Sequence, residues 1–431
     1  MRQWLFAVTV AITSLGTSAA MAAGPSFPRV GGINMGDPYN YNDPAYQAAL
    51  GKLDVMILKT YPGRTSWNPA ITAIKKINPQ ALVFFYVTVS ERNTSSSSGT
   101  AWDAYLSKLN TMKWWLYPTG TSGSPVTSPY GSTFKSINVS TYTKRDSAGL
   151  NGIEWMTKFY YDQYYKPNTA ADGFFMDNLL TMPNVSGDWN RDGTTDSKTA
   201  AISGTYWRQG YATYLKKIKT LMPGKPQIGN IGALGVATAT YPEYAGLLDG
   251  GVIEGLIGKS WSVETFAGWK EALNRYRKVM KATIGRKLVI VNQWGSPTDY
   301  QGARYGIATT LLDDGYHSYT NTAKGYTGVV WFDEYNANLG QAVSLPPTAA
   351  WKSGVWRRDF ENGISLVNPK GNGPRTVTLE GDFILLKGAQ APTVNSGKTV
   401  RTVTLKDRDG LILKRVTPVA KPAAPAVPSF D

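Results

Sequence analysis

Two acidic residues each end a short run of apolar residues. Asp177 ends the stretch G-F-F-M-D, and Glu254 ends G-V-I-E. In a (β/α)8 barrel, an acid at the carboxyl end of a buried strand points toward the ligand. Two carboxylates across one barrel mouth suit cleavage of a glycosidic bond, because one stays ionised while the other donates a proton to the leaving oxygen. Either acid could instead pair with Lys59 or cap a following helix.

Other polar residues close to the ends of predicted strands are candidates for substrate binding. Lys59 could contact a sugar or neutralise Asp177, and Trp294 could be a sugar platform or a buried core residue. The acidic pair at 333–334 is a third candidate for acid chemistry. The predicted substrate-binding residues are Asn34, Lys59, Tyr61, Tyr86, Asn178, Asn230, Trp294, Asp333 and Glu334.

Two other kinds of catalysis find little support in the sequence. There are 0 Cys residues, so thiol chemistry is excluded and any metal site must use oxygen ligands or histidine. His317 is the only histidine, and we expect it in a loop before the last barrel strand. A Ser-His-Asp arrangement would need that loop to reach the barrel mouth. No organic cofactor is expected.

The alternation of apolar runs and helical segments predicts the fold. Nearly unbroken apolar strands separated by helices are typical of a parallel sheet. A long insertion, residues 91–166, interrupts the alternation before the strand that ends at Asp177. The expected strands are eight, the number of a (β/α)8 barrel, at residues 30–34, 54–59, 81–89, 173–176, 227–231, 251–257, 287–293 and 328–332.

The predicted domain boundaries follow from changes in pattern. The pair Pro346-Pro347 ends the barrel region, 23–347. Residues 348–416 form short alternating runs between Gly, Asn and Asp, which predicts a small antiparallel, β-sandwich-like domain. Residues 417–431 are rich in Pro and Ala, and we expect this tail to be disordered.

The first 22 residues have the pattern of a secretory signal peptide. Arg2 precedes an apolar run from Trp4 to Leu15, and Ala20-Met21-Ala22 fits a cleavage site. We therefore expect a secreted or periplasmic protein. A membrane span needs about 18 consecutive apolar residues, and no other stretch approaches this length, so no integral membrane association is expected. We also expect a monomer.

The composition is basic and aromatic. The 431 residues include 45 Lys and Arg against 30 Asp and Glu, a net charge of +15. This balance fits an anionic polymer, a negatively charged cell surface or plain solubility. The basic residues are scattered and no nucleic-acid-binding motif is present, so no nucleic acid partner is expected. The 14 Trp, 25 Tyr and 13 Phe offer flat faces for stacking on sugars.

The stretch D-W-N-R-D-G-T-T-D, residues 188–196, has the spacing of a calcium loop. Its predicted ligands are Asp188, Asn190, Asp192, the carbonyl of Thr194, and Asp196. Position twelve is Thr199, where such loops have a bidentate Glu. We predict a structural Ca²⁺ here, and the alternative is an Asx-turn loop without an ion.

Three motifs carry a resemblance to known families. The patterns D-G-F-F-M-D-N, G-N-I-G and L-D-G-G-V-I-E-G resemble the hypothetical glycosyl hydrolase families, most closely family 15. They are also similar to the endo-α-1,4-polygalactosaminidase group, glycoside hydrolase family 114. That resemblance implies a retaining mechanism with Asp177 as nucleophile and Glu254 as general acid/base.

The sequence thus predicts an exported glycoside hydrolase that acts on a polysaccharide. One alternative is a carbohydrate-binding protein on the same scaffold without activity. Another is a cell-surface interaction protein that binds through its basic charge. Changing Asp177 to Asn would separate the first alternative from an enzyme, since a hydrolase would lose turnover and keep binding.

Overall fold

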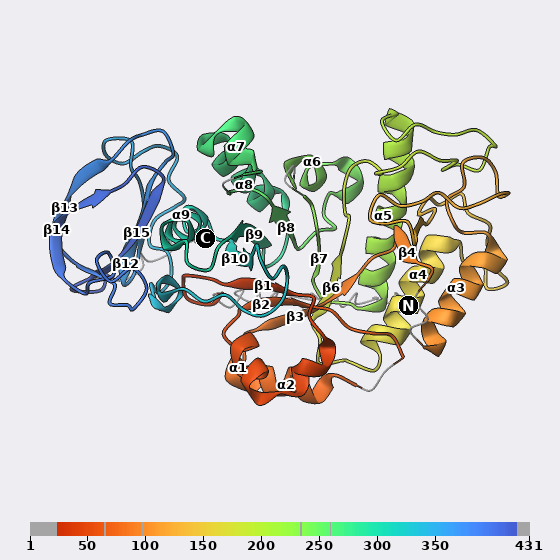
Figure 1. Ribbon diagram of the computed structural model, residues 1–431, viewed down its shortest axis with the longest axis horizontal. Helices are drawn as coiled ribbons and strands as arrows, with labels where there is room; N and C mark the ends of the chain where they lie inside the picture. Colours follow the sequence, from red (N-terminus) through yellow and green to blue (C-terminus); the bar gives the residue numbers. More distant parts are fainter. Residues whose placement is uncertain (1–23, 64–65, 96–98, 233–234, 259, 420–431) are drawn as a thin grey trace, which may run out of the picture.

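Figure 1 shows the computed structural model, in which residues 24–63, 66–95, 99–232, 235–258 and 260–419 are described. The predicted signal peptide and most of the predicted tail, residues 420–431, lie outside these ranges. Within the described residues, no helix is long and apolar enough to cross a membrane.

The described residues form a (β/α)8 barrel. Five parallel strands pair in the order β1-β2-β3-β6-β7, and three more pair as β8-β9-β10. Single parallel bridges between Asn230 and Val252 and between Val30 and His317 join the two sheets and close the ring. The strands are β1 (Gly31–Asn34), β2 (Val55–Leu58), β3 (Leu82–Val87), β6 (Gly173–Met176), β7 (Gln227–Gly229), β8 (Gly250–Glu254), β9 (Leu288–Gly295) and β10 (Tyr316–Asn321).

The barrel interior is filled by side chains from alternating strand positions. Large apolar residues, among them Phe84, Phe175 and Ile290, are buried there in one cluster. The intervening residues pack outward against the helices in a second, larger cluster. Since both faces of these strands are covered, their sequences are continuous apolar runs.

The expected eighth strand at 328–332 was wrong. β10 takes that place, and residues 328–332 lie outside regular structure. The sequence of β10, Y-H-S-Y-T-N, does not predict a buried strand, because polar residues point into the barrel. Ser318 and Thr320 each donate a hydrogen bond of 3.0 Å to Asn292 Oδ1, which satisfies their hydroxyl groups.

Helices surround the barrel, and the predicted insertion forms a substructure between β3 and β6 (Figure 1). This insertion contains the two-stranded pair β4 (Glu91–Asn93) and β5 (Phe134–Ser136). Its helices pack through aromatic residues such as Trp102 and Phe159, whose ring centroids are 5.5 Å apart. Many aromatic residues therefore serve the core. The α-helices are α1 (Pro44–Leu50), α2 (Asn68–Ile77), α3 (Thr100–Met112), α4 (Gly152–Tyr160), α5 (Ala201–Leu221), α6 (Gly235–Ala239), α7 (Val263–Ala267), α8 (Trp269–Ala282) and α9 (Tyr300–Thr310).

The C-terminal domain is a curled antiparallel sheet with strand order β11-β12-β15-β13-β14. Its strands are β11 (Trp356–Phe360), β12 (Gly363–Asn368), β13 (Arg375–Leu385), β14 (Thr399–Leu405) and β15 (Asp409–Arg415). In place of the second sheet of a sandwich, α9 of the barrel lies against β12 and β15 (Figure 1). Leu411 and Leu413 belong to the domain's own core, whereas Ile412 between them joins the barrel core. The domain is therefore built onto the barrel wall.

Candidate active site

Asp177 lies at the carboxyl end of β6 and accepts three hydrogen bonds. The Tyr86 hydroxyl donates to Oδ2, while Asn230 Nδ2 (3.1 Å) and the Asn178 backbone N–H (2.9 Å) donate to Oδ1. Asn178 has a φ of +54°, in the left-handed region that Asn tolerates better than most residues. This turn ends the strand and leaves the Asp177 carboxylate fixed at the barrel mouth.

Glu254 lies at the carboxyl end of β8 and faces the same space. Its Oε1 accepts a hydrogen bond from the Tyr326 hydroxyl, and its Oε2 accepts one of 3.1 Å from Asn230 Nδ2. The Trp294 ring meets the Tyr326 ring edge to face, with centroids 4.8 Å apart. Trp294 therefore supports the tyrosine that contacts Glu254.

One asparagine side chain joins the two acids. Asn230 Oδ1 accepts the backbone N–H of Gly232 at 2.9 Å, so its amide nitrogen must face the carboxylates. Because that nitrogen is 3.1 Å from Asp177 Oδ1 and 3.1 Å from Glu254 Oε2, these oxygens are at most twice 3.1 Å, or 6.2 Å, apart. The two predicted acids therefore form a pair.

The pair opens into a cavity of about 350 Å³ at the carboxyl end of the strands. Its charged lining residues are the two acids, and the remaining ones are apolar, aromatic or amide. The lining residues are Ile33, Met35, Tyr86, Tyr130, Phe175, Asp177, Asn178, Leu180, Asn230, Gly232, Glu254 and Tyr326.

The two tyrosines on the acids remain hydrogen-bond donors. Burial, followed by the charge of Asp177, raises the pKa of Tyr86 far above its usual value. Burial and the charge of Glu254 likewise raise the pKa of Tyr326. Both hydroxyls therefore keep their protons and point them at the carboxylates.

A third carboxyl group, Glu91, lies behind this pair and was missed by the sequence reasoning. Its Oε1 accepts Asn178 Nδ2 at 2.8 Å, and its Oε2 accepts Ser90 Oγ at 2.5 Å. Burial, with a contribution from Asp177, raises the pKa of Glu91 to about 7. The sequence offered only a weak signal, since Glu91 follows an apolar strand but opens the insertion.

The insertion also supplies one wall of the cavity. Tyr130 donates a hydrogen bond of 2.9 Å to Asn178 Oδ1 and accepts one of 3.0 Å from Asn184. Together with Glu91, these contacts hold both ends of the Asn178 amide. Tyr130 was also missed, because it lies in a Gly/Ser/Thr/Pro loop without periodicity.

Several predicted binding residues are not among those that line the cavity. Asn34 is buried and donates to the Tyr46 hydroxyl at 2.6 Å. Lys59 Nζ lies 5.3 Å from the centre of the Tyr61 ring. Of the predicted binding residues, those that line the cavity are Tyr86, Asn178 and Asn230.

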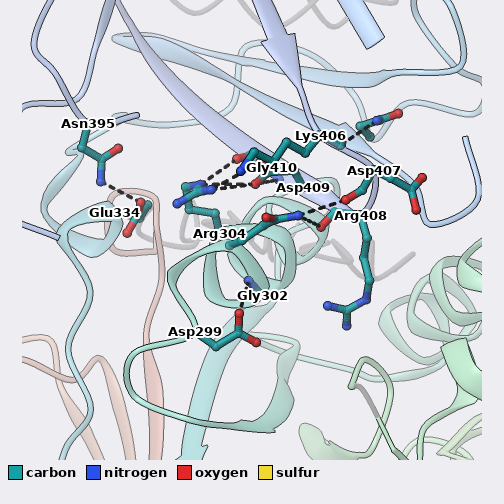
Figure 2. A network of polar contacts seen from close by, with 12 residues as sticks. Asp299, Gly302, Arg304, Glu334, Asn395, Lys406, Asp407, Arg408, Asp409 and Gly410 are labelled. Carbon is teal, nitrogen blue, oxygen red and sulfur yellow. Dashed lines mark hydrogen bonds and ion pairs between the residues drawn. The ribbon is translucent and has the colours of Figure 1, made fainter. Parts of the chain in front are cut away.

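Asp333 and Glu334 do not line the cavity, so the prediction that they bind substrate at the barrel mouth is wrong. The backbone N–H of Gln390 donates to Asp333 Oδ2 at 2.7 Å. Asn395 Nδ2 donates to Glu334 Oε1 at 2.9 Å, as Figure 2 shows. Both acids therefore hold the C-terminal domain to the barrel. The sequence predicts them at the mouth because the apolar run at 328–332 predicts a strand that would end there.

His317 lies on β10 and not in a loop. It is buried, with Nδ1 2.7 Å from the Tyr335 hydroxyl and Nε2 3.1 Å from Gln293 Oε1. Burial lowers the pKa of His317 to about 3. This neutral histidine is a structural part of the barrel wall.

The predicted calcium loop is closed by its own hydrogen bonds. Asp188 is buried, and the backbone N–H groups of Gly120, Asp192 and Gly193 donate to its two carboxylate oxygens. Across the described ranges, no three acidic or histidine side chains are grouped so that they could hold a metal ion. The ligand set of Asp188, Asn190, Asp192, Thr194 and Asp196 does not fit a metal site, and the arrangement matches the Asx-turn alternative.

Comparison with known proteins yields a family and a fold. The profile described as hypothetical glycosyl hydrolase family 15 matches residues 75–364. Among solved structures, Eubacterium rectale Amy13B is similar at 11% identity and a TM-score of 0.51, over 89% of this chain and 93% of that one. The glycoside hydrolase domain of PelA from Pseudomonas aeruginosa matches at 15% identity and a TM-score of 0.43, over 71% and 99%. No curated protein matches the chain.

Proposed function

The chain belongs to hypothetical glycosyl hydrolase family 15 and is a glycoside hydrolase, and we propose that Asp177 and Glu254 cleave its glycan with retention of anomeric configuration. The observation that carries this proposal is the Asn230 amide, which donates to both carboxylates at 3.1 Å. It holds two acids from different strands at one point of the cavity.

The hydrogen bonds favour Asp177 as the nucleophile. From the described residues it accepts three, against two for Glu254, and donors to a carboxylate stabilise its ionised form. Asp177 would attack the anomeric carbon while Glu254 gives its proton to the departing oxygen. Glu254 would then take a proton from water, whose oxygen displaces Asp177 and frees the sugar.

The separation of the acids supports retention. The two oxygens bonded to Asn230 are at most 6.2 Å apart, a limit that allows the about 5–5.5 Å between the carboxyl groups of retaining enzymes. Proton NMR of the first product formed would test this. A product that keeps the anomeric configuration of its substrate supports the proposal, and an inverted one refutes it.

The charge of the cavity favours a neutral or cationic glycan. Although the chain has a net charge of +15, the described residues that line the cavity include Asp177 and Glu254 and no Lys or Arg. Glu91 adds a third carboxyl group behind them. A uronic acid polymer would bring like charges into this space. We therefore propose that the substrate is an amino-sugar or neutral polysaccharide. We also propose that the segment 1–22 directs export, so that the protein acts on this substrate outside the cytoplasm.

A polysaccharide screen on the mature protein tests this function. Release of reducing ends would be compared for polygalactosamine, chitosan, neutral glucans and polygalacturonate. Asp177→Asn and Glu254→Gln should remove activity on the polymer that is cleaved, while affinity electrophoresis detects retained binding. Wild-type protein that binds without releasing reducing ends would favour the carbohydrate-binding alternative.

A further inference from the structure

The chain that follows Glu254 makes a tight turn and returns to the strand end. Gly255 has a φ of +71°, and a Cβ there would collide with the Trp261 ring. The backbone N–H groups of Val263 and Glu264 then donate to the carbonyls of Gly255 (2.9 Å) and Leu256 (3.1 Å). The described residues of this segment, 255–258 and 260–264, are therefore linked directly to the strand end that carries Glu254.

This returning segment has a buried acid whose partner lies in the C-terminal domain. Glu264 is 3% exposed, so its carboxylate requires a charged or hydrogen-bonding partner. Arg408, in the turn between β14 and β15, donates from Nε to Oε1 (3.1 Å) and from Nη2 to Oε2 (2.9 Å). Arg408 Nη2 also donates to the Gly258 carbonyl at 3.1 Å. One side chain thus binds the segment at two positions, Gly258 and Glu264.

The backbone of Arg408 is in an unfavourable conformation for a residue with a side chain. Its φ is +53°, where glycine would be less strained. The side chain lies over the Tyr305 ring, 4.7 Å from the centroid, which orients the guanidinium. In Figure 2 it extends away from the neighbouring cluster of Arg304 and Asp409.

We propose that Arg408 is a positioning residue that fixes Glu254 through residues 255–258 and 260–264, so that the C-terminal domain is part of the catalytic unit. This inference rests on the proposed role of Glu254 as general acid/base. The mechanism is geometric: a planar guanidinium fixes a carboxylate and a carbonyl together, which a flexible contact would not do. A small displacement of a catalytic group lowers the rate strongly.

A second ion pair between the same two domains provides a matched control. Arg304 on α9 is buried and binds Asp409, with Nη2 3.0 Å from Oδ1. This pair holds the domain to α9 and makes no hydrogen bond or ion pair with residues 255–258 or 260–264. Arg304→Met should remove one buried ion pair between the domains and leave the Arg408 contacts to Gly258 and Glu264 in place, whereas Arg408→Ala removes those contacts.

The test compares two leaving groups in the full mature protein. The substrates are a galactosamine oligosaccharide and the same oligosaccharide with a 2,4-dinitrophenyl leaving group, which departs without a proton from the acid. Arg408→Ala should lower kcat on the first substrate by roughly 10- to 100-fold. With the second substrate, the rate of the glycosylation step should change little. Arg408→Lys should recover part of the loss. Equal losses on both substrates, or the same pattern in Arg304→Met, would overturn the proposal.

Glu254→Gln separates this inference from the function on which it rests. If Glu254→Gln shows the leaving-group dependence and Arg408→Ala does not, the positioning role fails while the proposed function stands. If neither variant shows the leaving-group dependence, the proposed role of Glu254 as general acid/base is refuted, and with it the inference for Arg408. Hydrogen exchange of residues 255–268 requires no substrate. Faster exchange in Arg408→Ala than in Arg304→Met supports the inference, and equal exchange refutes it.

Discussion

Replacing Asn230 by Ala should slow the enzyme without unfolding it. The substitution removes one amide that makes two hydrogen bonds of 3.1 Å to Asp177 and Glu254. A hydrogen bond to a charged group contributes about 1.5–3 kcal/mol. Loss of one such bond from the transition state lowers kcat/KM by roughly 10- to 150-fold, and loss of both would exceed this range. We therefore expect a decrease of at least about tenfold.

The assay is release of reducing ends from the polymer that the screen identifies, with thermal unfolding measured in parallel. Asn395→Ala is the control, because Asn395 is also a buried amide and donates to the Glu334 carboxylate at 2.9 Å, and neither residue lines the cavity. The control should lose stability and keep kcat/KM. If Asn230→Ala retains wild-type kcat/KM, the amide does not organise the acid pair, and the reasoning is refuted.

Three further predictions follow from the same region and its surroundings. Tyr326→Phe removes the hydroxyl that donates to Glu254, and should lower kcat/KM about tenfold; unchanged kinetics would contradict its role. Because burial raises the pKa of Glu91 from 4.5 to about 7, the native state binds this proton more tightly than the unfolded chain, so stability should fall as pH rises from 4.5 to 7, by up to about 3 kcal/mol. Urea unfolding across this range should show a smaller decrease for Glu91→Gln, and parallel profiles would contradict the assignment. Because backbone N–H groups bind both Asp188 oxygens, millimolar Ca²⁺ should leave the Tm within about 1 °C of its value in EGTA, and a clear rise on adding Ca²⁺ would restore the metal site.

Local pattern was sufficient for most of the barrel. Apolar runs such as V-M-I-L in β2 are buried on both faces, and no other environment suits them. Where polar residues face inward, as in β10, the pattern failed, because their hydrogen-bond partners lie on β9 and are invisible in a single segment. The run at 328–332 shows the opposite case, because its apolar residues predict a strand that does not form. Phe332 is buried at the rim of the barrel without any strand pairing.

The sequence by itself determined that Asp177 and Glu254 end buried strands, since strand ends follow from local apolar runs. It could not determine what surrounds them. Glu91, Tyr130 and Tyr326 reach the site from the insertion and from a loop after β10, across large separations along the chain. Such contacts depend on how whole elements pack, and only the tertiary structure decided them. The same holds for Arg408, whose partner Glu264 lies in the other domain.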